Sequence, residues 1–436
     1  MRTRREINSA EWFGEVPDGW NMVPLPRLFM SSKGMTVTRA DLVDEGAPVV
    51  NYAQVHSKLN NRFGIHEELI KHVPTGMVPK GLKYSEKGSF IFACTSEDLA
   101  GCGDCIYNDS ERPVNPGGDT LLLSPVDEVE NKYLAYLFST DMWRWQIRRD
   151  LIDVKVFHVN QGNLHETYVT VPPCDVQRRI VSYLDERCAA IDDDVKKRQK
   201  VIERLKEYKK SLIAHAVTKG LDPTAEMKDS DIKWVDQIPS NWQTSKLKAL
   251  FQITKRIAGV EGLTVLSITQ DGIRPKDFST GKGQFAETYS HYQLVHPGDF
   301  AMNHMDLLTG WVDISRYEGV TSPDYRVFSA RDLAVSNPSY YLYLFQMCYL
   351  NLVFFGSANG VADKGRMRLQ TNAFNNFVVP LPPLEEQKRI AAYLDERCVA
   401  IDEAISRQEQ LIEKLGEYRK SVIHHAVTGK IDCTEA

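Results

Sequence analysis

The chain has 436 residues, a net charge of -5 at pH 7 and an ordinary globular composition, so two or three domains are expected. No apolar run reaches the ~18 residues of a transmembrane helix, and the polar stretch 1–12 argues against a secretory signal. The eight cysteines form no disulfide-like framework, which suits a cytoplasmic protein, and the mildly acidic charge still permits local basic patches for nucleic acid.

Residues 1–174 form the first predicted domain, which opens with the stretch 12–29, in which Pro17 lies between Trp12 and Trp20. Short β-branched and aromatic stretches bounded by glycine follow, such as 89–92 and 120–123, and these are typical of strands with turns between them. The apolar run 133–138 is typical of a helix. We therefore expect a mixed α/β domain of about 160 residues, which is a usual domain size.

Residues 175–222 form the first predicted spacer helix, rich in Glu, Lys, Arg, Ala and Leu, without proline, and with Gly220 near its end. Its apolar residues recur with a heptad period over about five heptads, which predicts a coiled-coil seam. Arg198 and Lys209 interrupt this seam, and polar seam residues can fix register. The apolar seam residues are Leu184, Cys188, Ile191, Val195, Ile202, Leu205, Leu212 and Ala216.

The rest of the chain repeats this layout, with a second predicted domain at 223–384 and a second spacer helix at 385–436. The opening 234–251 repeats the spacing of the first, 340–345 corresponds to 133–138, and 263–266 and 377–379 are predicted strands. From Gln387 the second helix aligns with the first without a gap, and more than half of the positions are identical. The second seam consists of Leu394, Cys398, Ile401, Ile405, Ile412, Leu415, Val422 and Ala426.

Such a long period indicates two copies of one large module, because solenoid repeats are much shorter. A long solvated surface helix is the alternative to a coiled coil. Two like seams in one chain argue against it, since each seam has an obvious partner in the other. The predicted fold is therefore two globular α/β domains separated by two long antiparallel coiled-coil helices, with an internal pseudo-two-fold repeat.

The second helical copy contains a distinctive set of residues: Pro382-Pro383-Leu384-Glu385-Glu386-Gln387, Arg389-Ile390, Leu394-Asp395, Ile401-Asp402, Leu415 and Tyr418-Arg419-Lys420-Ser421. In these residues it resembles the conserved helical region of the specificity subunit of type I restriction-modification systems. The first copy departs from the pattern after Pro172-Pro173 and rejoins it at Gln177. The layout of the whole chain resembles that of the family, and the match is specific in the helices and weak within the domains.

The resemblance implies a non-catalytic, DNA-binding subunit in host defence against foreign DNA, in which each variable domain reads one half of a bipartite target. Antiparallel helices of ~40 residues, ~60 Å long, would set the spacer between half-sites that lie ~34 Å apart. The implied partners are double-stranded DNA, two methylation subunits docked on the helices and two restriction subunits. S-adenosylmethionine, ATP and Mg²⁺ would belong to these partners, and no cofactor to this chain. A coiled-coil interaction scaffold that reads no DNA, and an enzyme with an unrecognised site, are the alternatives.

No sequence motif predicts catalysis by this chain alone. The stretch Asn337-Pro338-Ser339-Tyr340 resembles the Asn-Pro-Pro-Tyr loop of adenine methyltransferases, but a helix N-cap followed by proline is the better interpretation. The Gly-Lys pairs in 280–283 and 428–430 do not fit a phosphate-binding loop and are predicted turns.

Cys94, Cys102 and Cys105 contain one C-x-x-C pair, whereas a structural zinc site usually has four ligands. The repeat aligns 101–105 with 310–314, where apolar residues replace the cysteines, so buried strand cysteines are expected and no metal site. His424 and His425 are predicted helix-surface residues.

Base reading requires Arg, Asn, Gln, Ser or Thr at groove edges, and phosphate binding requires Lys and Arg. Mixtures of these residues occur in loops at 51–62 and near 160 in the first domain, and at 267–276 and 357–368 in the second. A solvated surface side chain is the alternative for any one of them. The candidate DNA-binding residues are Gln54, Lys58, Arg62, Asn160, Gln161, Thr269, Gln270, Arg274, Lys276, Lys364, Arg366 and Arg368.

Overall fold

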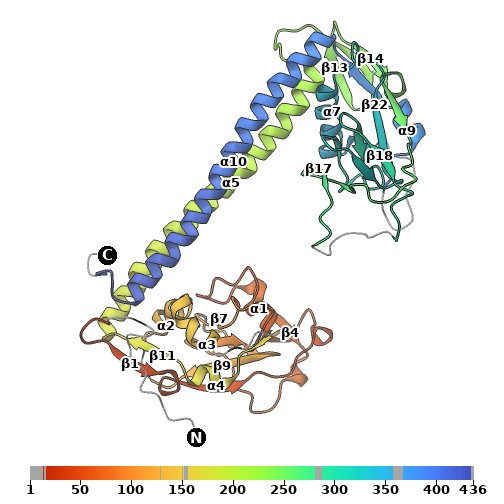
Figure 1. The fold of residues 1–436 in the computed structure, drawn as a ribbon. Coiled ribbons are helices and arrows are strands. Elements are labelled where there is room, and N and C mark those ends of the chain that lie inside the picture. The colour runs from red at the N-terminus through yellow and green to blue at the C-terminus, as the bar shows by residue number, and fades with distance from the viewer. Residues whose placement is uncertain are drawn as a thin grey trace. The chain divides into compact units, whose positions relative to one another are not determined.

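The computed structural model describes Phe13 and residues 16–127, 129–149, 151, 156–279, 287–356 and 367–433. The chain divides into two compact units (Figure 1). The first unit comprises Met1–Lys197 and Gln410–Ala436, and the second comprises Arg198–Glu409. Each unit therefore combines one globular α/β domain with parts of both long helices.

The first unit contains a four-stranded antiparallel sheet in the order β2-β9-β5-β7, a three-stranded sheet in the order β4-β3-β8, and two strand pairs, β1-β11 and β10-β6. Its strands are β1 Asn21–Pro24, β2 Phe29–Lys33, β3 Ala47–Val50, β4 Lys71–Val73, β5 Phe90–Ala93, β6 Thr95–Ser96, β7 Cys105–Tyr107, β8 Asn115–Pro116, β9 Thr120–Pro125, β10 Phe157–His158 and β11 Tyr168–Val171. Its short helices are α1 Tyr52–Val55, α2 Asn131–Phe138, α3 Asp141–Arg148 and α4 Gln161–His165, with 3-10 turns at Leu25–Arg27, Arg39–Asp41, Glu67–Leu69 and Thr75–Met77.

The second unit contains a four-stranded antiparallel sheet in the order β15-β22-β19-β20 and the strand pairs β12-β13, β14-β23, β16-β17 and β18-β21. Its strands are β12 Met227–Ile232, β13 Val235–Pro239, β14 Gln243–Lys246, β15 Phe251–Thr254, β16 Leu266–Thr269, β17 Gly272–Pro275, β18 Gln293–Val295, β19 Phe300–Met302, β20 Val312–Ile314, β21 Gly319–Thr321, β22 Arg326–Ala330 and β23 Val378–Leu381. Its short helices are α6 Leu247–Leu250, α7 Pro338–Leu350, α8 Val353–Gly356 and α9 Thr371–Asn376.

The main sheets of the two units repeat one register. Phe29 of β2 lies opposite Pro125 of β9, and Phe251 of β15 lies opposite Ala330 of β22. In the same way β5 and β7 correspond to β19 and β20, so that Cys105, opposite Phe92, is equivalent to Val312, opposite Met302. The alignment of Cys105 with residue 314 was therefore wrong by two positions, although an apolar residue still replaces the cysteine.

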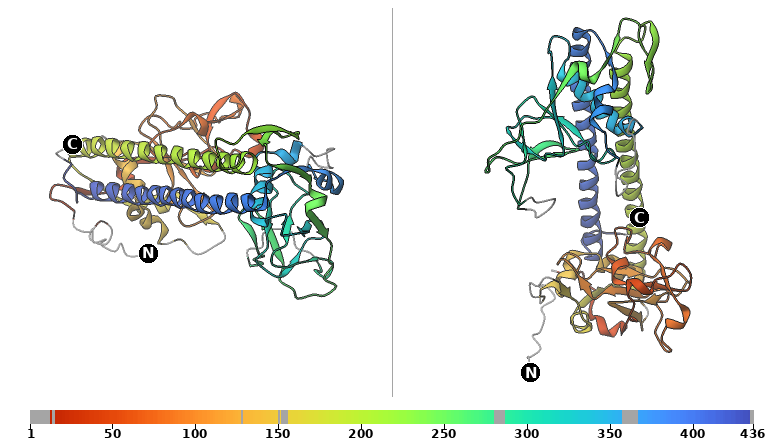
Figure 2. Two further views of the ribbon diagram at one scale, coloured as in Figure 1. Left: turned by 90° about the horizontal axis from the view of Figure 1, so that it is seen from above. Right: turned by 90° about the vertical axis from the view of Figure 1, so that its right-hand side faces the viewer.

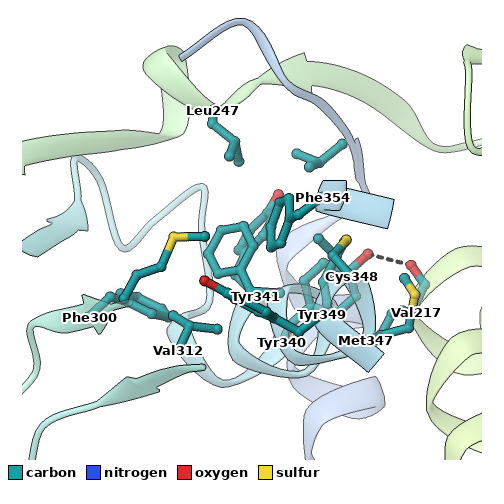
Figure 3. Close-up of a cluster of buried hydrophobic side chains, with 14 of the residues drawn as sticks. Val217, Leu247, Phe300, Val312, Tyr340, Tyr341, Met347, Cys348, Tyr349 and Phe354 are labelled. Atoms are coloured by element: carbon teal, nitrogen blue, oxygen red, sulfur yellow. Dashed lines mark hydrogen bonds between the residues drawn. The ribbon is translucent and has the colours of Figure 1, made fainter. Parts of the chain in front are cut away.

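Aromatic clusters form the cores of both units. In the first unit Phe90, Phe92, Phe138 and Trp143 are completely buried and pack edge to face or tilted. In the second unit α7 contributes much of the core: its Tyr340, Tyr341, Cys348 and Tyr349 lie in the cluster with Phe300 and Val312 (Figure 3). The predicted apolar helices at 133–138 and 340–345 are thus confirmed as α2 and α7. Both helices are buried on nearly all sides, so each is a core element of its own domain.

Two long helices account for the repeated sequence: α5 spans Cys174–Lys219 and α10 spans Leu384–Val427. Each is free of proline after its first turn, and each is followed by a glycine with positive φ, Gly220 at 79° and Gly429 at 69°. Only glycine adopts this left-handed conformation without a steric penalty, so these residues end the helices. The prediction of two long helices is confirmed.

Within each unit α5 and α10 lie side by side (Figures 1 and 2). In the first unit Arg419 Nη1 donates to Asp192 Oδ1 at 2.6 Å, and in the second Lys209 Nζ donates to Asp402 at 2.7 Å. All predicted seam residues are buried or half-buried, and Arg198 of the seam donates to Gln408 Oε1 at 3.0 Å. The polar seam positions are therefore satisfied by polar partners across the helix pair.

Equivalent side chains fasten each domain to the helix pair of its own unit. Gln177 at the start of α5 accepts from the Glu130 amide at 2.9 Å, and Gln387 at the start of α10 accepts from the Asn337 amide at 2.8 Å. Both glutamine side chains also donate to the carbonyl five residues earlier, at Pro172 and Pro382. Both are fully buried, so they are structural residues that both copies of the repeat retain.

The tyrosines of α2 and α7 complete these attachments. Tyr133 donates to the Val427 carbonyl at the end of α10, and Tyr340 donates to the Val217 carbonyl near the end of α5 at 2.8 Å (Figure 3). Each domain therefore binds the start of one long helix and the end of the other. Because these two ends lie at the same domain, the two helices run in opposite directions within each unit.

One predicted strand was misplaced: β16 begins at Leu266, and 263–265 precede it. Val265 makes only an isolated bridge to Val320, and Leu263 is 38 % exposed, so Leu266 is the one residue of this predicted run that belongs to a strand. The predicted strands at 89–92, 120–123 and 377–379 are confirmed as β5, β9 and β23, each shifted by at most one residue at its start. No helix in the described parts of the chain is long and apolar enough to cross a membrane.

Candidate nucleic-acid interface

The loop of residues 51–63 follows β3 in the first unit and carries three candidate DNA-binding residues. Asn51 caps α1, and Gln54 reaches back so that its Oε1 accepts from the Asn51 amide at 3.1 Å. The side chain of Asn60 donates to the carbonyls of Val55 at 2.7 Å and Cys105 at 3.1 Å. The loop is thus held to β7 by its own polar side chains, which fixes its shape without a bound partner.

A buried charge cluster holds the end of this loop. Asp104 Oδ1 accepts from Arg144 Nη2 at 2.5 Å and from Arg62 Nη2 at 2.8 Å, and Oδ2 lies 3.2 Å from His56 Nδ1. The Arg144 side chain is only 2 % exposed and that of Asp104 13 %. The single carboxylate balances one of the two guanidinium charges: it is the counter-charge of buried Arg144, whereas Arg62 is 35% exposed and still reaches water. This cluster, Asp104 with its three partners, positions the loop from beneath.

The same cluster fixes the protonation states of its members. Burial alone would raise the pKa of Asp104, but the hydrogen bond from His56 and the charges of Arg144 and Arg62 outweigh it and lower the pKa to about 2. The hydrogen bond to Asp104 raises the pKa of His56 above its ordinary 6.5, although burial opposes the shift. His56 Nε2 lies 2.8 Å from the Thr95 carbonyl, so both ring nitrogens face acceptors and the protonated ring fits best.

A pH dependence follows from His56. Because its folded pKa is raised, the stability that its protonation contributes is complete below 6.5 and is lost as pH rises through the folded pKa. Asp104, the Thr95 carbonyl and the more distant Asp98 are the groups that favour this charge. We expect the first unit to lose more unfolding free energy between about pH 6 and about pH 9 in the wild type than in His56→Gln. Urea unfolding at both pH values measures this, and equal losses would contradict it.

The first-domain candidates differ in whether their side chains already form hydrogen bonds or ion pairs within the protein. Lys58 is exposed, whereas the Arg62 side chain is only 35 % exposed and bound to Asp104. Asn160 caps α4 by accepting from the Asn163 amide at 3.1 Å, and Gln161 donates to Ser31 Oγ at 2.6 Å. Four of the five predicted residues of this domain, including Gln54, therefore have structural partners, and their contact with DNA stays a prediction.

In the second unit Thr269, Gln270 and Arg274 lie on the hairpin formed by β16 and β17, and Lys276 follows it directly. Ile273 of this hairpin donates its amide to Asp313 Oδ2 at 3.0 Å, which fastens the hairpin to β20. Gln270 and Arg274 are exposed, and the Thr269 hydroxyl donates to the Gly272 carbonyl at 3.1 Å inside the turn. The Lys276 ammonium lies over the Phe278 ring, 5.4 Å from its centre. The exposed part of the hairpin therefore presents the Gln270 amide and the Arg274 guanidinium group, with the exposed Asp271 carboxylate between them in sequence.

A second segment of this unit, 367–370, precedes α9 and carries the exposed Arg368. Its backbone is held by buried Arg326, whose Nη2 donates to the Leu369 carbonyl at 3.0 Å and whose guanidinium carbon lies 4.5 Å from the centre of the Phe374 ring. Burial lowers the pKa of Arg326 to about 10. The predicted residues Lys364 and Arg366 lie outside the described residues.

The cysteines and histidines show no metal-binding arrangement, since the described residues contain no group of three or more metal-ligating side chains. Cys105 is buried in β7 as expected, but Cys94 lies just after β5 and Cys102 in a turn, so these two are not strand cysteines. His424 and His425 are half-buried near the end of α10, not fully on its surface.

The residues 337–340 form a helix start and not a catalytic loop. Asn337 is the N-cap of α7: its side-chain oxygen accepts from the Tyr340 amide at 3.0 Å, and Pro338 occupies the first helical position. This confirms the prediction of an N-cap followed by proline.

Sequence reasoning missed the Asp104 cluster. Asp104, Arg144 and Arg62 are far apart in the chain, and no local pattern links them. The buried pair Gln177 and Gln387 was also missed as an attachment, although its retention in both copies of the repeat was a usable signal.

Comparisons with known proteins identify the family. The family model of the type I restriction modification DNA specificity domain matches residues 17–204 and 239–414, which covers most of the chain and both repeats. A putative type I restriction enzyme MjaX specificity subunit from Methanocaldococcus jannaschii is 25% identical over 340 residues, covering 75% of this chain and 74% of that protein. The EcoBI specificity subunit from Escherichia coli is 21% identical over 307 residues, covering 65% of this chain and 63% of that protein.

Two solved structures share the fold. A chain from a structure of a type I R-M system superposes with a TM-score of 0.69 at 15% identity, covering 96% of this chain and all of that one. The HsdS subunit from Thermoanaerobacter tengcongensis superposes with a TM-score of 0.53 at 16% identity, covering 97% of this chain and all of that one. With a family match over both repeats and a shared fold, this chain belongs to the family of type I restriction-modification DNA specificity subunits.

Proposed function

We propose that this chain is a non-catalytic recognition subunit in which each of the two variable domains reads one half of a bipartite DNA target. The observation that carries the proposal is the duplication: two units share one sheet register, one set of attachments to the long helices and one family match. The loops that they carry differ in sequence and support, as expected of domains that read different bases.

Exposed cations on these loops support DNA binding. Lys58 in the first unit, and Arg274 and Arg368 in the second, form no ion pair with the residues that the structure describes. Lysine and arginine side chains without an acidic partner are available for phosphate oxygens or base edges. The net charge of -5 means that such cations must act locally, because the chain as a whole does not attract DNA.

We further propose that α5 and α10 form a coiled-coil spacer on which two methylation subunits dock. Each unit presents an exposed apolar pair on one long helix: Val201 and Tyr208 on α5, 41% and 54% exposed, and Leu411 and Tyr418 on α10, 39% and 53% exposed. The pairs occupy equivalent positions of the repeat and are seven residues apart, so each lies on one helix face. Two equal apolar patches fit two copies of one partner.

In this proposal S-adenosylmethionine, ATP and Mg²⁺ act in the methylation and restriction subunits, two of each. The helix-capping role of Asn337 supports this assignment, because the side chain that would otherwise position an adenine amino group is engaged with its own helix. Adenine methylation and DNA cleavage would then be activities of the assembly.

The proposed function is tested by mapping adenine methylation across the genome of a cell with and without this chain. We expect one split motif to lose methylation when the chain is removed, and the motif gives both half-sites and the spacer. If no motif changes, competition between specific and random duplex in a gel-shift assay decides. Equal binding of random duplex, or no binding, would favour the interaction scaffold and contradict DNA reading.

A further inference from the structure

The 51–63 loop ends in a hydrogen-bonded turn, and the side chains of Arg62 and Phe63 in this turn contact different residues. Arg62 has a φ of 71°, an unusual left-handed conformation for a residue with a side chain. Its amide donates to Asn60 Oδ1 at 2.8 Å, and the amide of Phe63 donates to Asn61 Oδ1 at 2.9 Å. From this turn Arg62 binds Asp104, whereas Phe63 packs on other residues.

Phe63 contacts two side chains that are tied to the long helices. Its ring centre lies 4.4 Å from that of Tyr136, and the guanidinium carbon of Arg419 lies 5.7 Å above it. Tyr136 donates to Asp185 Oδ1 of α5 at 2.6 Å, and Arg419 of α10 donates to Asp192 of α5 at 2.6 Å. The ring is half-buried. Phe63 therefore contacts both Tyr136, which binds the domain to α5, and Arg419, which forms the ion pair between α10 and α5.

The second unit repeats the helix side of this arrangement without the ring. Tyr343 donates to Asp395 at 2.7 Å as Tyr136 does to Asp185, and Lys209 pairs with Asp402 as Arg419 does with Asp192. Among the residues that the structure describes in this unit, no aromatic ring lies over the Lys209 ammonium. Within the described parts of the two units, a contact between a loop ring and the helix ion pair therefore occurs in the first unit only.

We propose that Phe63 is a positioning residue that couples the reading loop 51–63 of the first domain to the α5–α10 helix pair through Arg419. The proposal rests on the proposed function, since it takes this loop to read DNA. Coupling between two sites is reciprocal: a partner that orders the helices around Arg419 strengthens recognition of the first half-site, and DNA in the loop steadies the helices there. Recognition of the second half-site does not depend on the equivalent ion pair.

The contact itself is tested by hydrogen exchange in the full chain, which requires no knowledge of the DNA target. Arg419→Gln removes the charge above Phe63, and Lys209→Gln is the matched change in the second unit. We expect the amides of Arg62 and Phe63 to exchange about two- to fivefold faster in Arg419→Gln, the range of a cation–π contact. Lys209→Gln should leave exchange at 267–276 unchanged. Unchanged exchange at Arg62 and Phe63 in Arg419→Gln would overturn the proposed coupling of the loop to the helix pair.

The consequence for DNA reading is tested with duplexes selected from a random library by the full chain. Phe63→Leu keeps apolar volume but removes the ring, and Phe63→Trp keeps a ring. We expect Phe63→Leu to lose about five- to tenfold in discrimination against a changed first half-site, with less than about a twofold effect at the second. Phe63→Trp should keep most of the discrimination.

The failures of this inference and of the proposed function are distinguishable. Equal losses at both half-sites in Phe63→Leu, or none at the first, would overturn the positioning role while DNA reading stands. A wild-type chain that binds selected and random duplexes equally would overturn the proposed function and, with it, the role of Phe63 in reading.

Discussion

Replacing Asp104 by alanine is expected to lower the free energy of unfolding of the first unit by about 3–5 kcal/mol. The change leaves the Arg144 guanidinium, 2 % exposed, without a counter-charge, and it also releases Arg62 and His56. Removing one member of a buried charge cluster is costly because the remaining charge stays desolvated. Urea unfolding with hydrogen exchange measured over β5 and β7 reports the first unit separately from the second.

Arg144→Met in the Asp104→Ala background is the informative control. Methionine fills the same volume without a charge, so the double variant should recover part of the lost stability. A second control is Asp141→Ala, which removes a 74 % exposed partner of Arg148 and should change stability by less than about 1 kcal/mol. A loss of less than about 1 kcal/mol in Asp104→Ala would contradict the view that this cluster holds the loop.

The long helices and their apolar faces were predictable because a heptad pattern is local and was present twice. Every apolar seam residue of α5, from Leu184 to Ala216, is buried or half-buried, and so is every one of α10. The helix ends were readable as well, since Gly220 and Gly429 follow the last regular turns. The sequence periodicity identifies the packed face of each helix, and the repeat indicates that the packing partner is the other long helix.

The support of the candidate DNA-binding loops could not be predicted, because it depends on contacts between distant residues. From the sequence, Arg62 is indistinguishable from an unpaired loop cation. The structure shows that it pairs with Asp104, which lies 42 residues further along the chain. Phe63 reads as an ordinary core aromatic, and nothing local relates it to Arg419. The exposed candidates Lys58, Arg274 and Arg368 remain the simplest predictions for DNA contact, since they form no ion pair with any residue in the described ranges.

Replacing Ile191 and Ile401 together by glutamate is expected to separate α5 from α10 and abolish binding of the methylation subunits. Both isoleucines are 7% exposed, and a carboxylate at either position must lose most of its hydration. We expect each unit to lose about 2–4 kcal/mol of unfolding free energy, as for other unpaired charges introduced into a packed interface. Loss of partner binding in co-purification should accompany the loss in urea stability.

The matched control places the same charges on the outer helix face. Val201→Glu with Leu411→Glu changes residues that are 41% and 39% exposed at equivalent positions of the repeat, so stability should change by at most about 0.5 kcal/mol. If these residues form the docking patches, this variant also loses the methylation subunits while its helices stay paired. The two double variants thus separate the spacer from the docking surface, and an intact complex after the Ile191 and Ile401 changes would refute the spacer role.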